Sequence, residues 1–217
     1  MMPVIRPGEV TIMKNDPPLQ TNAGMPVFII TGEQGEGKTT YLMEILEEIS
    51  KRAIRMSGIV APGYFSGGLR SGFSLIDVAT GKTEELCMTE PAPDTVQHGR
   101  YYFRNAGISF GCNAIHNPVY EKRSDLVVID EVGRFELSSA MWAESIDRLC
   151  TMDHPPMIWT VRKELIDAVS KRWPDNTWVI AEIKIMSQSI LISHIMSEVR
   201  RYQQRADRLR KTRQPRS

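Results

Sequence analysis

The sequence has few cysteines and histidines and no long apolar segment. Its three cysteines, Cys87, Cys112 and Cys150, are odd in number and far apart, so they offer neither a disulfide framework nor a zinc-binding cysteine pair. The four histidines lack the spacing of metal ligands. No apolar run approaches the ~20 residues that a membrane-spanning helix needs, and the first residues lack the apolar core of a secretory signal. We therefore expect a protein of the reducing cytoplasm with no membrane span.

Charge is unevenly distributed along the chain, with an excess of positive charge at its C-terminus. The net charge is +1, but residues 200–217 contain eight Lys or Arg and one Asp, a net of +7, which leaves −6 for residues 1–199. Such a tail can contact nucleic acid or an acidic lipid surface. The alternative is the solvated end of a helix, and the single aromatic residue among these charges, Tyr202, gives little support to nucleic-acid stacking.

A glycine-rich segment near residue 35 matches the complete pattern of a phosphate-binding loop, G-x-x-x-x-G-K-[ST]. It consists of Gly32, Glu33, Gln34, Gly35, Glu36, Gly37, Lys38 and Thr39, and Thr40 follows it. Residues 26–31 are an apolar, β-branched run that predicts a buried strand, and residues 40–49 have their apolar positions on one helical face. Glycines let consecutive N–H groups turn inward and the helix dipole adds positive charge, so the segment predicts a nucleoside-phosphate site. In such a site Lys38 reaches the β- and γ-phosphates, and the Thr39 hydroxyl is a ligand of Mg²⁺.

A second apolar run, residues 125–129, ends in two acids, Asp130 and Glu131. Such a run is typical of a strand buried on both faces, and the C-terminal ends of parallel strands border the ligand crevice of an α/β sheet. We expect Asp130 to hold Mg²⁺ through water and Glu131 to orient and deprotonate an attacking water. Adjacent acids with these two roles favour hydrolysis over transfer to a bound acceptor.

Two arginines are candidates for stabilising the charge that develops on the transferred phosphate. Arg134 lies three residues beyond Glu131, and Arg70 lies in a glycine-rich segment upstream. An arginine at this step can accelerate hydrolysis greatly. For each of them a surface ion pair or a loop anchor is an equally good alternative, and Arg134 is the stronger candidate because it lies close to Glu131.

The alternation of predicted strands and helices indicates an α/β fold with a mostly parallel sheet and helices on both faces. We expect a glycine-rich turn over residues 63–68, an antiparallel hairpin insertion with arms at 72–78 and 83–88, and a loop over 89–99. We interpret the four tryptophans as core residues, one of which could lie near a base pocket.

Three segments in this order resemble a known family. After the phosphate-binding loop come Gly67-Gly68-Leu69-Arg70-Ser71-Gly72-Phe73 and Asp130-Glu131-Val132-Gly133-Arg134-Phe135-Glu136-Leu137-Ser138, and Gly99-Arg100-Tyr101 is similar to a further family segment. The chain resembles the P-loop nucleoside-triphosphatase family of the cancer-related nucleoside-triphosphatase type, over roughly residues 27–180. The resemblance implies a P-loop NTPase three-layer sandwich that hydrolyses ATP, GTP and other nucleoside triphosphates slowly, with Mg²⁺. The chain departs from the family pattern just before Gly67 and around residues 184–189, two regions that are able to contribute nucleotide contacts.

With this resemblance, we predict three regions: 1–23, a loosely ordered N-terminal arm; 24–188, the P-loop nucleoside-triphosphatase domain; and 189–217, a C-terminal helix and basic tail. Two other functions remain open. A nucleotide-binding sensor with little turnover would use the arm and tail as a partner surface. A P-loop small-molecule kinase would need an acceptor pocket and an arginine-rich lid, for which Val161-Arg162-Lys163 is slight.

Overall fold

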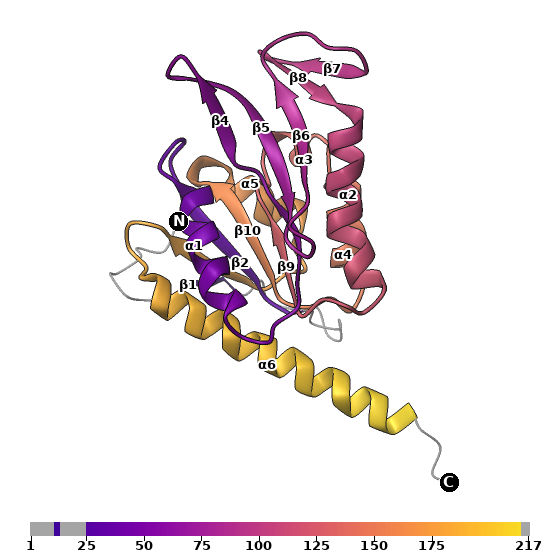
Figure 1. Ribbon diagram of the computed structural model, residues 1–217. Coiled ribbons are helices and arrows are strands. Elements are labelled where there is room, and N and C mark those ends of the chain that lie inside the picture. Colours follow the sequence, from indigo (N-terminus) through magenta and orange to yellow (C-terminus); the bar gives the residue numbers. More distant parts are fainter. Residues whose placement is uncertain (1–10, 14–24, 214–217) are drawn as a thin grey trace.

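The computed structural model describes residues 11–13 and 25–213, and its strands form one 11-stranded sheet with helices on both faces (Figure 1). The strands, in their order across the sheet, are β1 (Thr11–Met13), β11 (Trp178–Glu182), β2 (Val27–Gly32), β10 (Met157–Arg162), β9 (Leu126–Ile129), β3 (Met56–Val60), β5 (Leu69–Asp77), β6 (Thr83–Met88), β8 (Tyr101–Arg104) and β7 (Thr95–His98), while β4 (Gly63–Ser66) pairs with β5.

The sheet has a parallel core and antiparallel flanks. Strands β11, β2, β10, β9 and β3 run parallel. β1 joins one edge antiparallel, and β4 to β8 extend the other edge antiparallel. The predicted α/β class with an antiparallel insertion is confirmed, although the insertion is larger than one hairpin.

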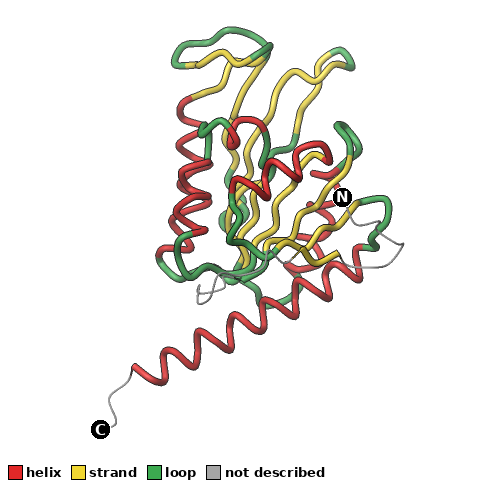
Figure 2. The backbone as a smooth tube through the Cα atoms, turned by 180° about the vertical axis from the view of Figure 1, so that it is seen from behind, coloured by secondary structure: helices red, strands yellow, loops and turns green. Residues whose placement is uncertain are grey.

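Helices cover the two faces of the parallel core and make three layers (Figures 1 and 2). One face carries α1 (Lys38–Ser50) and the long α6 (Gln188–Arg213). The other carries α2 (Asn105–Tyr120), α3 (Arg134–Leu137), α4 (Ala143–Cys150) and α5 (Ile166–Arg172), the last preceded by the 3-10 turn Lys163–Leu165. None of the helices within the described ranges is long and apolar enough to cross a membrane.

The alternation of side chains along each strand supplies two separate cores. In β2, Val27 and Ile29 pack with the layer of α2, α4 and α5, whereas Phe28 and Ile30 pack with α1 and α6. A strand buried on both faces is apolar at most positions, which is why the central strands lack a polar alternation. The prediction that the tryptophans are core residues is confirmed, since Trp142, Trp159, Trp173 and Trp178 are all buried in the first of these cores.

Three sequence-based expectations were wrong in detail. Residues 63–68 are not only a turn, because Gly67 and Gly68 both have positive φ and form a tight hairpin loop that lets β4 pair with β5. The expected loop 89–99 contains β7, which pairs with β8 across a turn at Gly99. Within the N-terminal arm, β1 pairs with β11, and the rest of residues 1–23 lie outside the described residues.

Candidate active site

The phosphate-binding loop joins the C-terminal end of β2 to the N-terminus of α1. Gly35 and Gly37 have φ of 79° and 91°, a region that residues with a Cβ adopt at a cost, so the glycines of the pattern serve the curl of the loop. Helix α1 begins at Lys38, directly after the Gly37 cap. The sequence prediction of a strand, a glycine loop and a helix N-terminus is confirmed as a structure.

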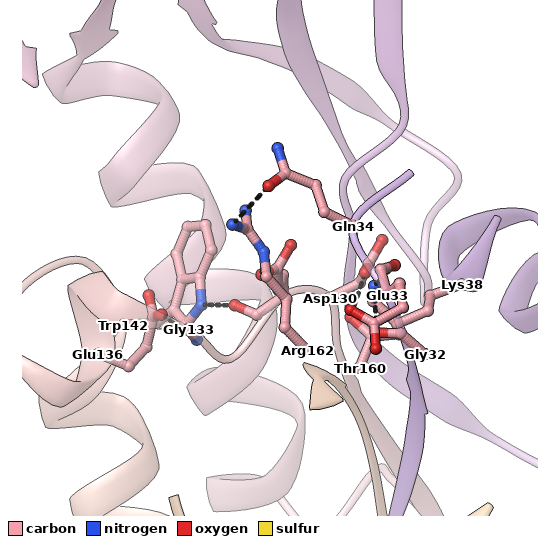
Figure 3. A network of polar contacts seen from close by, with 11 residues as sticks. Gly32, Glu33, Gln34, Lys38, Asp130, Gly133, Glu136, Trp142, Thr160 and Arg162 are labelled. Carbon is pink, nitrogen blue, oxygen red and sulfur yellow. Dashed lines mark hydrogen bonds and ion pairs between the residues drawn. The ribbon is translucent and has the colours of Figure 1, made fainter. Parts of the chain in front are cut away.

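Lys38 lies inside the loop it belongs to. Its Nζ donates to the carbonyl oxygens of Gly32 at 3.1 Å and of Glu33 at 2.7 Å, and only 8% of the residue is exposed (Figure 3). Burial lowers the pKa of Lys38, and the nearby carboxylate of Glu131 opposes that shift. The ammonium is therefore held at the centre of the loop by two carbonyls that an anion can replace.

Glu36, at a variable position of the pattern, ties the loop to the segment after β11. Its carboxylate accepts from the Glu33 N–H at 2.6 Å and pairs with Lys184, and the Lys184 contact is the main cause that lowers the pKa of Glu36. The Tyr41 hydroxyl donates to the Met186 carbonyl at 2.8 Å. Residues around 184–189, where the sequence departs from the family pattern, thus lie against the loop and its helix.

Asp130 follows β9 and is almost fully buried, with 2% of its surface exposed. Its carboxylate accepts from the Thr160 hydroxyl and from the Ala61 N–H at 3.0 Å, and the Thr39 side chain lies beside it. Burial raises the pKa of Asp130, while its contacts with these three residues oppose the rise. Thr39 and Asp130, proposed from sequence as one metal pair, lie together. Thr160 was missed, because one polar residue in an apolar strand gives no signal by itself.

Glu131, the neighbouring acid, is in a different environment. Its Oε1 accepts from Arg162 Nε at 2.8 Å, and its side chain is 35% exposed. Its backbone carbonyl accepts from Trp142 Nε1 at 3.2 Å, so one core tryptophan does border the site (Figure 3). The two adjacent acids are therefore separated by burial: Asp130 is enclosed and Glu131 is accessible.

The two arginines proposed from sequence, Arg134 and Arg70, make no hydrogen bond or ion pair with the loop or with the two acids in the described part of the chain. Arg134 is exposed at the start of α3, and its side chain has no hydrogen bond or ion pair with any residue in the described part of the chain. Arg70 lies on the antiparallel extension, with its guanidinium 5.2 Å and 5.1 Å from the ring centroids of Phe65 and Phe73. The predicted base instead contacts Arg162, a residue that the sequence offered only as part of a slight lid at 161–163.

Glu136 is a buried acid on α3. It is 2% exposed, and its Oε2 accepts from the Gly133 N–H at 2.7 Å. Burial is the main cause that raises the pKa of Glu136 to about 8. This hydrogen bond stabilises the turn that follows Glu131, which explains why residue 136 is an acid.

A glycine loop between a central strand and a helix, opposite two acids at the end of a second parallel strand, defines the class of P-loop proteins. Residues 27–196 match the model of a protein family described as NTPase. The chain belongs to this NTPase family.

Relatives and solved structures agree with this family. The chain is 30% identical to nucleoside-triphosphatase THEP1 of Methanocaldococcus jannaschii over 77% of its own length and 95% of the relative's. It is 28% identical to the protein of the same name from Sulfolobus acidocaldarius, over 78% and 91%. The crystal structure of THEP1 from Aquifex aeolicus matches with a TM-score of 0.59 at 21% identity, over 79% and 97% of the chains. The solution structure of a human cancer-related nucleoside triphosphatase matches with a TM-score of 0.58 at 20% identity, over 80% and 96%. At these identities the structural matches establish the fold.

Proposed function

We propose that this protein hydrolyses nucleoside triphosphates to nucleoside diphosphate and phosphate, with Mg²⁺ as cofactor. The observation that carries the proposal is the pair of acids Asp130 and Glu131 beside Lys38, one buried and one accessible. A buried carboxylate beside a phosphate-binding loop suits a metal, and an accessible one suits a water. Membership of the NTPase family supports the same activity.

The donors near the loop fit Mg²⁺ bound together with substrate phosphates. A carboxylate has about four acceptor positions, and the hydrogen bonds from Thr160 and Ala61 to Asp130 leave room for a further contact. Among the described residues there is no group of three or more His, Cys, Asp or Glu that would hold an ion without the nucleotide. Mg²⁺ commonly binds through one or two protein oxygens, waters and phosphates, which the Thr39 hydroxyl and Asp130 allow. When bound, the ion neutralises charge on the phosphates.

The protein's own groups account for the remaining chemistry. N–H groups of the loop and of the first turn of α1 are offered to the phosphates, and Lys38 exchanges its two carbonyl partners for phosphate oxygens. A water held by Glu131 attacks the γ-phosphorus, its proton passes to the carboxylate, and the bond between the γ-phosphorus and the bridging oxygen breaks. The diphosphate leaves with that oxygen. We assign Arg134 no contact, and its proposed role in charge stabilisation stays a prediction.

The test is phosphate release by purified protein with ATP, GTP, CTP and UTP, in Mg²⁺ and in EDTA. We expect release that requires Mg²⁺ and is lost in Glu131→Gln. Adding nucleosides and nucleoside monophosphates tests the kinase alternative, because a kinase would phosphorylate them. Tight triphosphate binding without release or transfer would instead support the nucleotide sensor.

We further propose a cytoplasmic location and leave the basic tail as a candidate polyanion contact. The three cysteines are all unpaired, which agrees with a reducing compartment. Within α6, Arg201 pairs with Glu198 and Arg205 with Asp153, so part of the tail's charge is already neutralised by the protein. Contact with nucleic acid or an acidic surface therefore depends on the charges further along.

A further inference from the structure

Arg162 occupies the position in the sheet where the two halves of the site meet. It is the last residue of β10, and β10 lies between β2, which carries the phosphate-binding loop, and β9, which carries the acids. In the parallel register Arg162 stands opposite Gly32, the first residue of the loop. Its backbone is therefore at the level of the first residue of the loop.

The guanidinium of Arg162 bridges both halves. Nε donates to Glu131 Oε1 at 2.8 Å, and Nη1 reaches Gln34 Oε1 at 3.4 Å, across the mouth of the loop (Figure 3). Its positive charge is close enough to Lys38 to contribute to the lowered pKa of that ammonium. Two cations thus converge at the loop, and the carboxylates of Glu131, Asp130 and Glu164 lie close enough to offset their charge.

The hydrogen bond from Arg162 takes up one of the acceptor positions of Glu131, the proposed base. A carboxylate that accepts a hydrogen bond from a guanidinium has fewer free lone pairs with which to orient a water. The pair is partly open to solvent, with side-chain exposures of 28% and 35%, and such ion pairs are weak. A γ-phosphate, with more negative charge and several acceptor oxygens, is a stronger partner for a guanidinium than one carboxylate.

We propose that Arg162 is a γ-phosphate-binding residue that holds Glu131 in the nucleotide-free protein and turns to the γ-phosphate when a triphosphate binds. The turn frees the Glu131 carboxylate for water and brings a positive charge to the phosphate that is transferred. A diphosphate lacks the γ-phosphate, so it leaves the ion pair in place. This inference rests on the proposed hydrolysis and adds to it a means of distinguishing triphosphate from diphosphate.

The test compares the affinities of a non-hydrolysable ATP analogue and of ADP, both with Mg²⁺, in the wild type and in Arg162→Ala. We expect the analogue to bind about tenfold more weakly or worse, the value of one charge-assisted hydrogen bond, while ADP affinity changes little. The kcat for ATP should fall by about 10²-fold or more. Arg162→Lys keeps the positive charge but lacks the planar guanidinium. Its affinity for the ATP analogue and its kcat should therefore lie between those of the wild type and of Arg162→Ala. Arg172→Ala is the matched control, since Arg172 forms a similar half-exposed pair with Asp147 away from the loop.

Two results would overturn the inference. Equal losses of ATP-analogue and ADP affinity would mean that Arg162 only maintains the loop. A fall in kcat with an unchanged ratio of the two affinities would mean that it only positions Glu131. If Arg162→Ala does not fold, the lysine variant gives the same comparison. Failure of the proposed hydrolysis is recognised separately, because the wild type would then release no phosphate while both affinities remain measurable.

Discussion

Replacement of Glu131 by glutamine separates a catalytic role from a structural one. The side chain keeps its length, and the amide oxygen can still accept the hydrogen bond that Arg162 Nε gives Glu131 Oε1 at 2.8 Å. What is lost is the negative charge and the ability to take a proton from water. Exchanging a charged for a neutral hydrogen bond costs about 1 kcal/mol, and less here because a third of the side chain is exposed. A chain of this size should then lose no more than about 2–4 °C in Tm.

The effect on turnover should be much larger than the effect on folding. Loss of a general base typically lowers kcat by about 10²-fold or more, equivalent to about 2.7 kcal/mol in the activation barrier. Triphosphate affinity should not fall, because the loop, Lys38 and the proposed Arg162 contact hold the phosphates and the substitution removes none of them. Steady-state phosphate release gives kcat, polarisation of a fluorescent triphosphate gives the affinity, and calorimetry gives Tm.

The matched control is Glu144→Gln, since Glu144 forms an exposed ion pair with Arg148 on α4. It should change neither kcat nor affinity. Equal losses of affinity and kcat in Glu131→Gln would place Glu131 in a structural role. Wild-type turnover in that variant would refute its assignment as the base.

Three further predictions concern other parts of the molecule. Lys38→Ala should abolish phosphate release and weaken triphosphate binding by about 10- to 100-fold, whereas Lys51→Ala, at an exposed pair with Glu48, should do neither; unchanged turnover in Lys38→Ala would refute the site. The pKa of Glu136 is raised from 4.5 to about 8, so the native state binds more protons than the unfolded state between these values, and the free energy of unfolding should fall as pH rises through this window. Urea unfolding at pH 5 and pH 8 should give a smaller difference for Glu136→Gln than for the wild type, and an equal difference would contradict the assignment. Deletion of residues 211–217, which include three Lys or Arg, should leave phosphate release intact and lower the salt at which the protein elutes from heparin, while co-elution with the full chain would dismiss a polyanion contact by these residues.

Much of the site was predictable from the sequence because each half is a continuous segment. The phosphate-binding loop depends on glycines, a lysine and a following helix within a short stretch, and the structure has them as predicted between β2 and α1. The apolar run ending in Asp130 predicted a buried strand for the same reason, since a strand covered on both faces is apolar throughout. The parallel core followed from the alternation of strands and helices.

The errors in the fold came from weak local signals. β4 and β7 are short strands of the antiparallel extension, and most of their residues are half-buried or exposed, so their hydrophobic pattern is faint. Helix α2 begins at Asn105 and includes Gly107, a poor helix former. A Cβ at Gly107 would lie 2.5 Å from the Glu85 carbonyl, so the glycine is there to let the helix approach β6.

By itself the sequence determined which segments bind phosphate and carry the acids, because those properties belong to runs of adjacent residues. Only the tertiary structure decided which distant side chains complete the site. Thr160 reaches Asp130, and Arg162 reaches Glu131, because β10 lies between β2 and β9 and its end meets the loop at Gly32. No periodicity within residues 157–162 encodes that neighbourhood. It arises from the order in which strands far apart in the chain pair with one another.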